Sequence, residues 1–338
     1  MIKIPFHNKN SKFYLLDIGA RGGMQWPWTL IDEKNLSTIL VEPDPEEATN
    51  LKNSFKNSKQ EVYILPIALW SKKVRLNLNL TKSPGASSVY EPNIDFLKQF
   101  PDITRFEIEK NIEFETNTID SLVDSGELKT IDFAKIDVQG AELDILKGGE
   151  SHFKSNLVGL EVEISFAHLY KDQPLFNDLD SFVRNQLGLE LWDIKKSYWK
   201  YENGRLQKGP AKGRLVFGDA LYFRPLTDIG AWLRNLPDDI ACNKIISLLT
   251  SVISYGYMDY AESILKDEGV LKYLDQNIVN HFRKLIKTTG SSMRISSVGV
   301  SSIYWAFITL ANIFKPSYKG WASSDRQLGS YKFGPFWF

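Results

Sequence analysis

Short apolar runs separated by charged or glycine-rich stretches dominate the first part of the chain. Residues 13–18 (FYLLDI) form one such run, which contains an acid near its end and is followed by a glycine-rich turn. Residues 38–41 and 61–67 form two more. Runs this short, bounded by Gly or Pro, predict buried β-strands. A charged stretch at 45–57 predicts a helix between the second and third strands. Strands that alternate with helices are typical of a parallel sheet with right-handed crossovers.

The middle of the chain is less regular. Residues 74–80 alternate strictly between apolar and polar side chains, which predicts a half-buried strand. We expect a helix near 93–100 and a strand near 106–116. Thr118 is expected to be the N-cap of a short helix.

The alternation of strands and helices then resumes. The expected elements are a strand at 131–137 that ends in an acid, a helix at 140–147 stopped by two glycines, a strand at 158–164, a helix at 175–187, and strands at 189–194 and 215–223. We place the end of this domain near Pro225, which gives a first domain over 1–226.

Residues 227–338 have a different pattern, which predicts a helical extension. Helices are expected over 239–254, 258–267 and 270–287. The segment 295–314 has no charged residue but contains several Ser, so it is marginal for a membrane span. Its apolar positions share one helical face. This favours a helix packed on the domain or in a homo-oligomer interface, and peripheral docking on a membrane and spanning are the alternatives.

Composition narrows the classes of function. The chain has 41 Lys and Arg and 41 Asp and Glu, so its formal net charge is zero. Nucleic-acid binding needs surplus positive charge, so we expect no nucleic-acid partner. The single cysteine, Cys242, excludes an intrachain disulfide framework and a Cys-rich zinc site. The amino-terminal residues lack the apolar run of a signal peptide. We therefore expect a cytoplasmic protein.

The glycine-rich turn after the first strand is the main candidate for a ligand site. Asp17, Gly19, Gly22 and Gly23 lie at the carboxyl end of that strand, where ligands bind in open parallel sheets. Glycines there let a ligand approach the backbone amides. Glu42 ends the second strand, where an acid can accept hydrogen bonds from both hydroxyls of an adenosine ribose.

Two classes of cofactor use such a layout. Dinucleotide enzymes require G-x-G-x-x-G, whereas this chain has D-x-G-x-x-G-G. Asp17 would repel a pyrophosphate, but it suits the ammonium group of S-adenosylmethionine. Charge complementarity therefore favours S-adenosylmethionine over NAD. A glycine turn that binds no ligand is the structural alternative.

Six motifs in order resemble those of the FkbM-type methyltransferases. They are DIGARGG (17–23), VEPD (41–44), AL (68–69), SSVY (87–90), TIDSL (118–122) and KIDVQGAE (135–142), and the resemblance covers roughly residues 12–225. It implies a class I methyltransferase fold, which is α/β and Rossmann-like, with a mostly parallel sheet and helices on both faces. It also implies S-adenosylmethionine as cofactor and, usually, O-methylation of a hydroxyl on a sugar or secondary metabolite.

Cofactor-binding residues are carried over from the motifs that match. These are Asp17, Gly19, Arg21, Gly22, Glu42, Ala68 and Ser88. The chain departs from the family pattern at two positions, because Arg21 stands where Asn is common and Gln139 where Glu is common. We interpret Arg21 as a residue that reaches an anionic substrate or the carboxylate of the cofactor.

Three residues are candidates for catalysis. Asp137 ends the fourth core strand, beside the expected methyl donor, and its structural alternative is a helix cap. Glu163 shares a face of the fifth strand with Glu161, and buried acids must be paired or used. His168 follows in a loop and can accept a hydroxyl proton, although a lone loop histidine is often structural. These three residues can also be imagined around a divalent cation, but their spacing has no metal signature, so no metal is expected.

The sequence therefore predicts an S-adenosylmethionine-dependent O-methyltransferase for a small-molecule or glycan hydroxyl. An NAD- or nucleotide-sugar-dependent oxidoreductase is the second hypothesis. The third is a non-catalytic scaffold with a relic cofactor pocket, whose carboxyl-terminal helices bind a partner or a membrane.

Overall fold

The computed structural model describes residues 2–6, 11–204, 213–290, 306–307, 309–310, 321–325 and 328–329. The helix predicted over 295–314 therefore lies outside the described residues, apart from four positions. Among the described residues, no helix combines the length and the apolar character that crossing a membrane requires.

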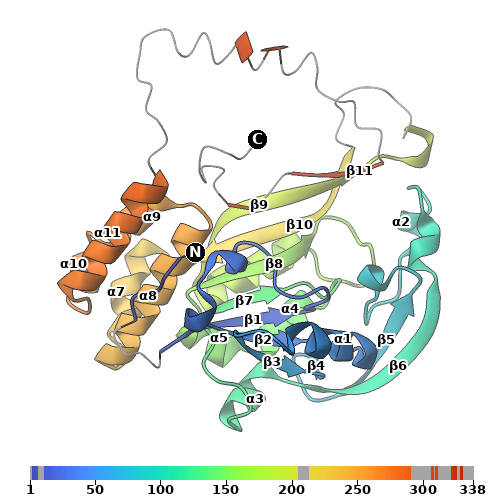
Figure 1. Ribbon diagram of the computed structural model, residues 1–338. Helices are drawn as coiled ribbons and strands as arrows, with labels where there is room; N and C mark the ends of the chain where they lie inside the picture. Colours follow the sequence, from blue (N-terminus) through green and yellow to red (C-terminus); the bar gives the residue numbers. More distant parts are fainter. Residues whose placement is uncertain are drawn as a thin grey trace.

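The central sheet lies at the middle of the molecule (Figure 1). In the described part of the chain its strands follow the spatial order β11-β9-β10-β8-β7-β1-β2-β3. They are β1 (Phe13–Ile18), β2 (Leu36–Val41), β3 (Glu61–Leu65), β7 (Phe133–Ile136), β8 (Gly159–Ser165), β9 (Glu190–Trp199), β10 (Arg214–Phe223) and β11 (Ala322–Ser324). Five neighbouring strands are parallel, namely β3, β2, β1, β7 and β8. Strand β10 is antiparallel to both β8 and β9. The predicted mostly parallel α/β sheet is confirmed.

A smaller sheet adjoins the carboxyl ends of β1 and β2. Its order is β4-β6-β5, made of β4 (Ala68–Leu69), β5 (Arg75–Thr81) and β6 (Ile108–Asn117). The strict alternation at 74–80 correctly predicted β5, whereas β4 is too short to give a periodic signal. The short helix α2 (Ile94–Leu97) follows β5.

One face of the central sheet is covered by four helices. They are α3 (Ile119–Asp124), α4 (Glu142–Gly148), α5 (Glu150–Asn156) and α6 (Phe176–Phe182), the last continued by a π turn at Val183–Leu187. Leu146 and Phe153 pack there against even-numbered sheet residues such as Ile136 and Val162. Thr118 is the N-cap of α3, as predicted, because its Oγ1 accepts a hydrogen bond from the Ser121 amide at 3.1 Å.

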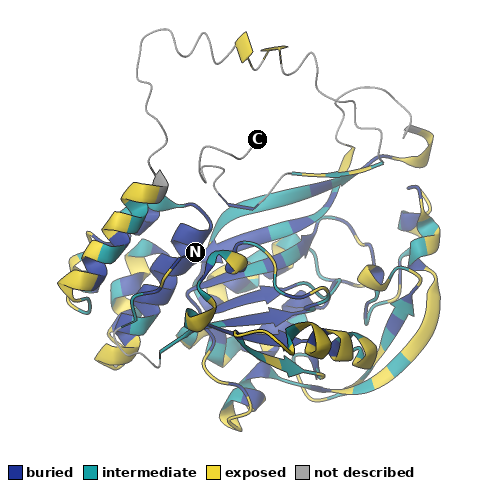
Figure 2. Cartoon of the chain, viewed as in Figure 1, coloured by how far each residue is buried: buried dark blue, intermediate teal, exposed yellow. Residues whose placement is uncertain are grey.

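The opposite face is covered by α1 (Pro45–Phe55) and by the helical extension. The extension consists of α7 (Leu226–Leu233), α8 (Asp238–Ser254), α9 (Met258–Ile264), α10 (Glu268–Leu271) and α11 (Gln276–Gly290). Ile245 and Leu249 of α8 belong to one buried cluster with Phe133, Leu221 and Phe223 of the sheet. Figure 2 shows the inner sides of these helices buried and the outer sides of α10 and α11 exposed. The predicted division at 226/227 thus falls at the start of α7, and the two parts share a core.

Two local expectations were wrong or incomplete. The single helix predicted over 270–287 is two helices, because Asp275 Oδ1 accepts a hydrogen bond from the Ile278 amide at 2.9 Å and starts a new helix there. Helix α5 was not predicted, because the two glycines at 148 and 149 indicated a stop. The connection from β1 to β2 contains only the 3₁₀ helices Trp28–Leu30 and Glu33–Asn35.

A buried ion pair fixes the extension to the sheet, and breaking it should destabilise the fold. Lys244 Nζ of α8 lies 2.7 Å from Asp132 Oδ1, and both side chains are almost fully buried. We expect Lys244→Met to lower the free energy of unfolding by about 3–5 kcal/mol in urea titrations, because it leaves a buried charge unpaired. The control Lys266→Met removes an exposed ion pair with Glu262 and should change it by less than about 0.5 kcal/mol. Equal stability of the two variants would contradict this.

Candidate active site

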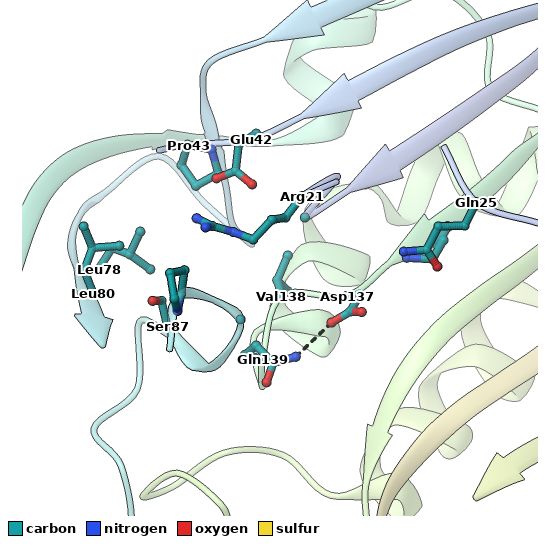
Figure 3. A pocket seen from close by; sticks show the side chains of 14 residues that line it. Arg21, Gln25, Glu42, Pro43, Leu78, Leu80, Ser87, Asp137, Val138 and Gln139 are labelled. Atoms are coloured by element: carbon teal, nitrogen blue, oxygen red, sulfur yellow. Dashed lines mark hydrogen bonds between the residues drawn. The ribbon is translucent and has the colours of Figure 1, made fainter. Parts of the chain in front are cut away.

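The carboxyl ends of β1, β2 and β7 open into a cavity of about 280 Å³ (Figure 3). From β1 the chain adds β2 and β3 on one side and later β7 on the other, so the cavity lies at the point where the strand order reverses. The lining residues are Gly19, Arg21, Gln25, Glu42, Pro43, Leu78, Leu80, Pro84, Gly85, Ser87, Lys135, Asp137, Val138 and Gln139.

Gly19 brings the turn after β1 against the end of β7. Its φ is +79°, and a Cβ built on it would lie 1.9 Å from the carbonyl oxygen of Asp137. No side chain fits at this position, so the backbone itself forms this wall of the cavity.

Asp17 is a buried acid with an unused acceptor. Its side chain is 2% exposed, and its Oδ1 has no hydrogen-bond partner within the described residues. Lys135 Nζ lies 3.8 Å from that oxygen. Burial raises the pKa of Asp17 to about 6, although the charge of Lys135 opposes the shift. An unsatisfied buried carboxylate oxygen beside a cavity is suited to a cationic ligand group.

Glu42 and Arg21 lie on the β2 side of the cavity. Glu42 is buried, and its Oε1 accepts a hydrogen bond from the Asp44 amide at 2.9 Å. Burial raises the pKa of Glu42. Arg21 Nη2 lies 3.2 Å from Asp44 Oδ2, and its side chain projects into the cavity in Figure 3. This side of the cavity therefore presents both an acceptor and a cation.

Gln139 holds two carboxylates together at the end of β7. Its Nε2 donates hydrogen bonds to Asp137 Oδ1 and to Glu163 Oε2, both at 2.9 Å. Its φ is +58°, a conformation that residues other than glycine rarely adopt. The Ser88 hydroxyl donates to the Gln139 carbonyl at 2.6 Å and stabilises this turn.

Glu163 and Glu142 are the acids most affected by this environment. Burial, reinforced by the charge of Asp137, raises the pKa of Glu163 well above its usual range. This environment therefore favours the protonated form of Glu163. Glu142 accepts hydrogen bonds from the amides of Val138 and Gly140, and burial raises its pKa to about 7. It acts as a cap that fixes the loop around Gln139.

Comparison with known proteins decides the family. Residues 17–188, half of the chain, match the family model of the methyltransferase FkbM domain. The chain belongs to the FkbM methyltransferase family. The predicted resemblance is confirmed, and with it the class I methyltransferase fold, in which the antiparallel β10 lies between β8 and β9. Members of this family use S-adenosylmethionine as methyl donor.

Solved structures similar to this FkbM-family chain are distant. The crystal structure of methyltransferase FkbM from Methylobacillus flagellatus KT is 14% identical over 65% of this chain, with a TM-score of 0.36. The match spans 46% of that protein, less than half of its length. TrmK from M. capricolum, solved with S-adenosylhomocysteine, is 10% identical over 82% of this chain and 92% of its own, with a TM-score of 0.27. A search of curated proteins finds no match.

The residues at the cavity fit the donor of the FkbM family. Glu42, which lines the cavity, would hold the ribose hydroxyls. Asp17, whose unused Oδ1 lies behind the lining residue Lys135, would hold the ammonium group. Arg21 and Lys135 line the same cavity and can balance the carboxylate of the donor. Within the described residues, no group of three or more His, Cys, Asp or Glu side chains is placed to hold a metal ion.

The predicted site residues differ in whether they line the cavity. Asp137, Gly19, Arg21 and Glu42 line the cavity, and Asp17, Glu163 and Ser88 contact residues that line it. Neither these three contacting residues nor the remaining three predicted residues line the cavity. The remaining three are Gly22, whose amide donates to Glu47, Ala68, which is buried in β4, and His168, which is exposed.

Several lining residues were missed. Leu78 and Leu80 come from the small sheet, and Gln25 from the connection after β1. The alternation at 74–80 showed that these leucines face inward, but not what they face. Lys135 had a visible signal, because a lysine inside an apolar strand has to find a buried partner or a ligand.

The raised pKa of Asp17 predicts a pH dependence of donor binding. An ammonium group binds the ionised carboxylate, so a proton on Asp17 competes with it. We expect the Kd of S-adenosylhomocysteine, measured by calorimetry, to rise about tenfold per pH unit below about pH 6. Asp17→Asn should bind about tenfold or more weakly at pH 8 and lose this component of the pH dependence. A wild-type Kd that is flat from pH 5 to 8 would refute the assignment.

Proposed function

We propose that this chain transfers a methyl group from S-adenosylmethionine to a hydroxyl oxygen of a sugar, glycan or glycan-like small molecule. One observation carries the proposal. The carboxylate of Asp137 lines the donor cavity. The Gln139 side-chain amide fixes its orientation, because Nε2 donates a hydrogen bond to Asp137 Oδ1 at 2.9 Å. A hydroxyl acceptor needs such an oriented base, because its proton must leave when the oxygen is methylated.

The donor supplies a methyl carbon made electrophilic by a sulfonium. With the donor bound, a bond would form between the acceptor oxygen and this carbon as the bond from carbon to sulfur breaks, and Asp137 would accept the hydroxyl proton. Gln139 positions Asp137, and the raised pKa of Glu163 favours its neutral form, which limits charge repulsion in this cluster. Alignment of the acceptor oxygen with the methyl carbon would supply much of the rate enhancement.

The charges at the site are more consistent with a small-molecule acceptor than with a nucleic acid. Asp137 and Glu42 line the donor cavity together with Arg21 and Lys135, Asp17 and Glu163 lie behind the lining, and the net charge of the whole chain is zero. Phosphate groups would be repelled by these acids and would find no general positive surface. A neutral polyhydroxylated acceptor meets neither obstacle.

We also propose a cytoplasmic setting, because the single cysteine is buried and the chain has no disulfide to maintain. Contact with a membrane surface or with a second copy through 295–314 stays a prediction from the apolar pattern of that segment.

Loss of the Asp137 base should reduce turnover without removing the donor. With labelled S-adenosylmethionine and a panel of mono- and disaccharides, we expect Asp137→Asn to lower kcat about 10²- to 10⁴-fold. The Kd of S-adenosylhomocysteine should stay within about threefold of wild type. Gln139→Ala should lower kcat in the same direction, because it frees the carboxylate that Gln139 orients.

The matched control is Glu113→Gln, which neutralises an exposed carboxylate on β6 that does not line the cavity. It should retain full activity. The proposal fails if the donor product does not bind, or if Asp137→Asn turns over as fast as wild type.

A further inference from the structure

A second cavity, of about 150 Å³, lies beside the donor cavity and shares Gln25 with it. Two aromatic residues line it, namely Trp26 in the β1–β2 connection and Tyr255, the residue that follows α8. Its floor is the face of the central sheet that the helical extension covers, where Glu161, Lys195 and Asp219 project from β8, β9 and β10. Nothing in the donor chemistry uses these side chains.

A row of charged residues, of which two are buried and one is half-buried, connects the two cavities. Asp17 of β1 is in register with Lys135 of β7, and Lys135 is in register with Glu161 of β8. Side chains in register on neighbouring parallel strands lie on one face of the sheet. The row therefore begins at the donor site, where Lys135 lines the first cavity, and ends at Glu161, which lines the second.

The polar groups of the second cavity are already ordered by one another. Lys195 Nζ lies 3.0 Å from Asp219 Oδ2, and the Tyr255 hydroxyl donates a hydrogen bond to Glu161 Oε2. Burial raises the pKa of Glu161 to about 7, while the charge of Lys135 opposes the shift. Each carboxylate has a second oxygen that can accept a further hydrogen bond, and Lys195 has further donors.

This lining selects the chemical class of the ligand. Carboxylates, an ammonium group and the Gln25 amide provide both acceptors and donors, which the hydroxyls of a sugar require. The ring of Trp26 lies edge-on to Tyr255, with centroids 6.2 Å apart, and adds an apolar surface for the C–H face of a sugar ring. Two carboxylates against one lysine disfavour phosphates and other anions. The small volume accommodates a group about the size of one ring.

We propose that this second cavity is the acceptor subsite and that it binds one pyranose ring beside the methyl donor. The inference rests on the proposed function, and it adds the residues that recognise the acceptor. Trp26 provides the stacking surface, Asp219 and Lys195 bind ring hydroxyls, and Tyr255 fixes Glu161 as an acceptor.

The assignment gives the helical extension a role in the reaction. Lys195, Asp219 and Tyr255 lie outside residues 17–188, the part that matches the family model. Donor binding is thus supplied by the matched part of the chain, whereas recognition of the acceptor depends on the last strands and on the extension. Leu328, from the end of the chain, closes the same cavity.

The test is sugar binding by the full chain saturated with S-adenosylhomocysteine. Saturation-transfer NMR would use glucose, galactose, mannose, rhamnose, fucose and N-acetylglucosamine as probes. We expect at least one of them to bind, and we expect Trp26→Ala and Asp219→Asn each to weaken that binding about tenfold. Trp26→Phe, which keeps an aromatic surface, should recover most of it. The control Glu113→Gln should bind as wild type does.

Calorimetry with S-adenosylhomocysteine on every variant separates the two levels of failure. A Kd within about threefold of wild type shows that the variant is folded and that the donor site is intact. If wild type does not bind S-adenosylhomocysteine, the proposed function fails. If it binds S-adenosylhomocysteine but no sugar of the panel, or if Trp26→Ala and Asp219→Asn bind the sugar as wild type does, the acceptor subsite is overturned and the donor assignment stands.

Discussion

The close approach of the Gly19 backbone to the carbonyl oxygen of Asp137 is the constraint on which the site depends. A single added carbon would lie 1.9 Å from that oxygen, so the turn after β1 and the end of β7 meet only because residue 19 has no side chain. This contact places the carboxylate of Asp137 on the cavity, and the unused oxygen of Asp17 lies behind the cavity wall, 3.8 Å from the lining residue Lys135. It also sets the start of the loop in which Gln139 is held at a positive φ. The donor-binding and proton-transfer roles proposed for these residues therefore both depend on the close contact between Gly19 and the end of β7.

The central sheet carries several charged side chains beneath the helical extension. They are tolerated there because each lies next to a side chain of opposite charge. The row from Asp17 through Lys135 to Glu161 alternates in sign across three strands. On β9 and β10, Lys195 pairs with Asp219, which is in register with Glu163 of β8. Isolated, any of these groups would be strongly unfavourable in a sheet interior. Together they form a polar floor under the helical extension, which is otherwise packed by apolar side chains. A cavity with such a floor is more consistent with binding a polar ligand than with a packing defect.

The features that could be predicted from the sequence are those that a local pattern of residues determines. The central strands, the Thr118 cap and the acid and glycine positions of the first turn all have signals within a few residues, and the structure has them where expected. Features that depend on distant segments meeting were not accessible. Ser88 was expected at the cofactor, but it is Ser87 that lines the cavity, since one residue along an extended segment reverses the side chain. Trp26, Lys195 and Tyr255 are far apart in the sequence, and only the packing of the extension brings them together.

The extension is part of the enzyme core and is not a free module. Tyr255 packs against Phe133 and Trp28 of the first part of the chain, and Lys244 of α8 is buried against Asp132. Nearly every residue of α8 from Ala241 to Ser254 is buried, so α8 offers no free face to a partner, and the exposed surface of the extension is the outer side of α10 and α11. Removing the helices of the extension would expose the sheet and open the second cavity to water at the same time. The same packing that stabilises the fold therefore forms the wall of the proposed acceptor subsite, which makes a purely structural role for the extension the weaker interpretation.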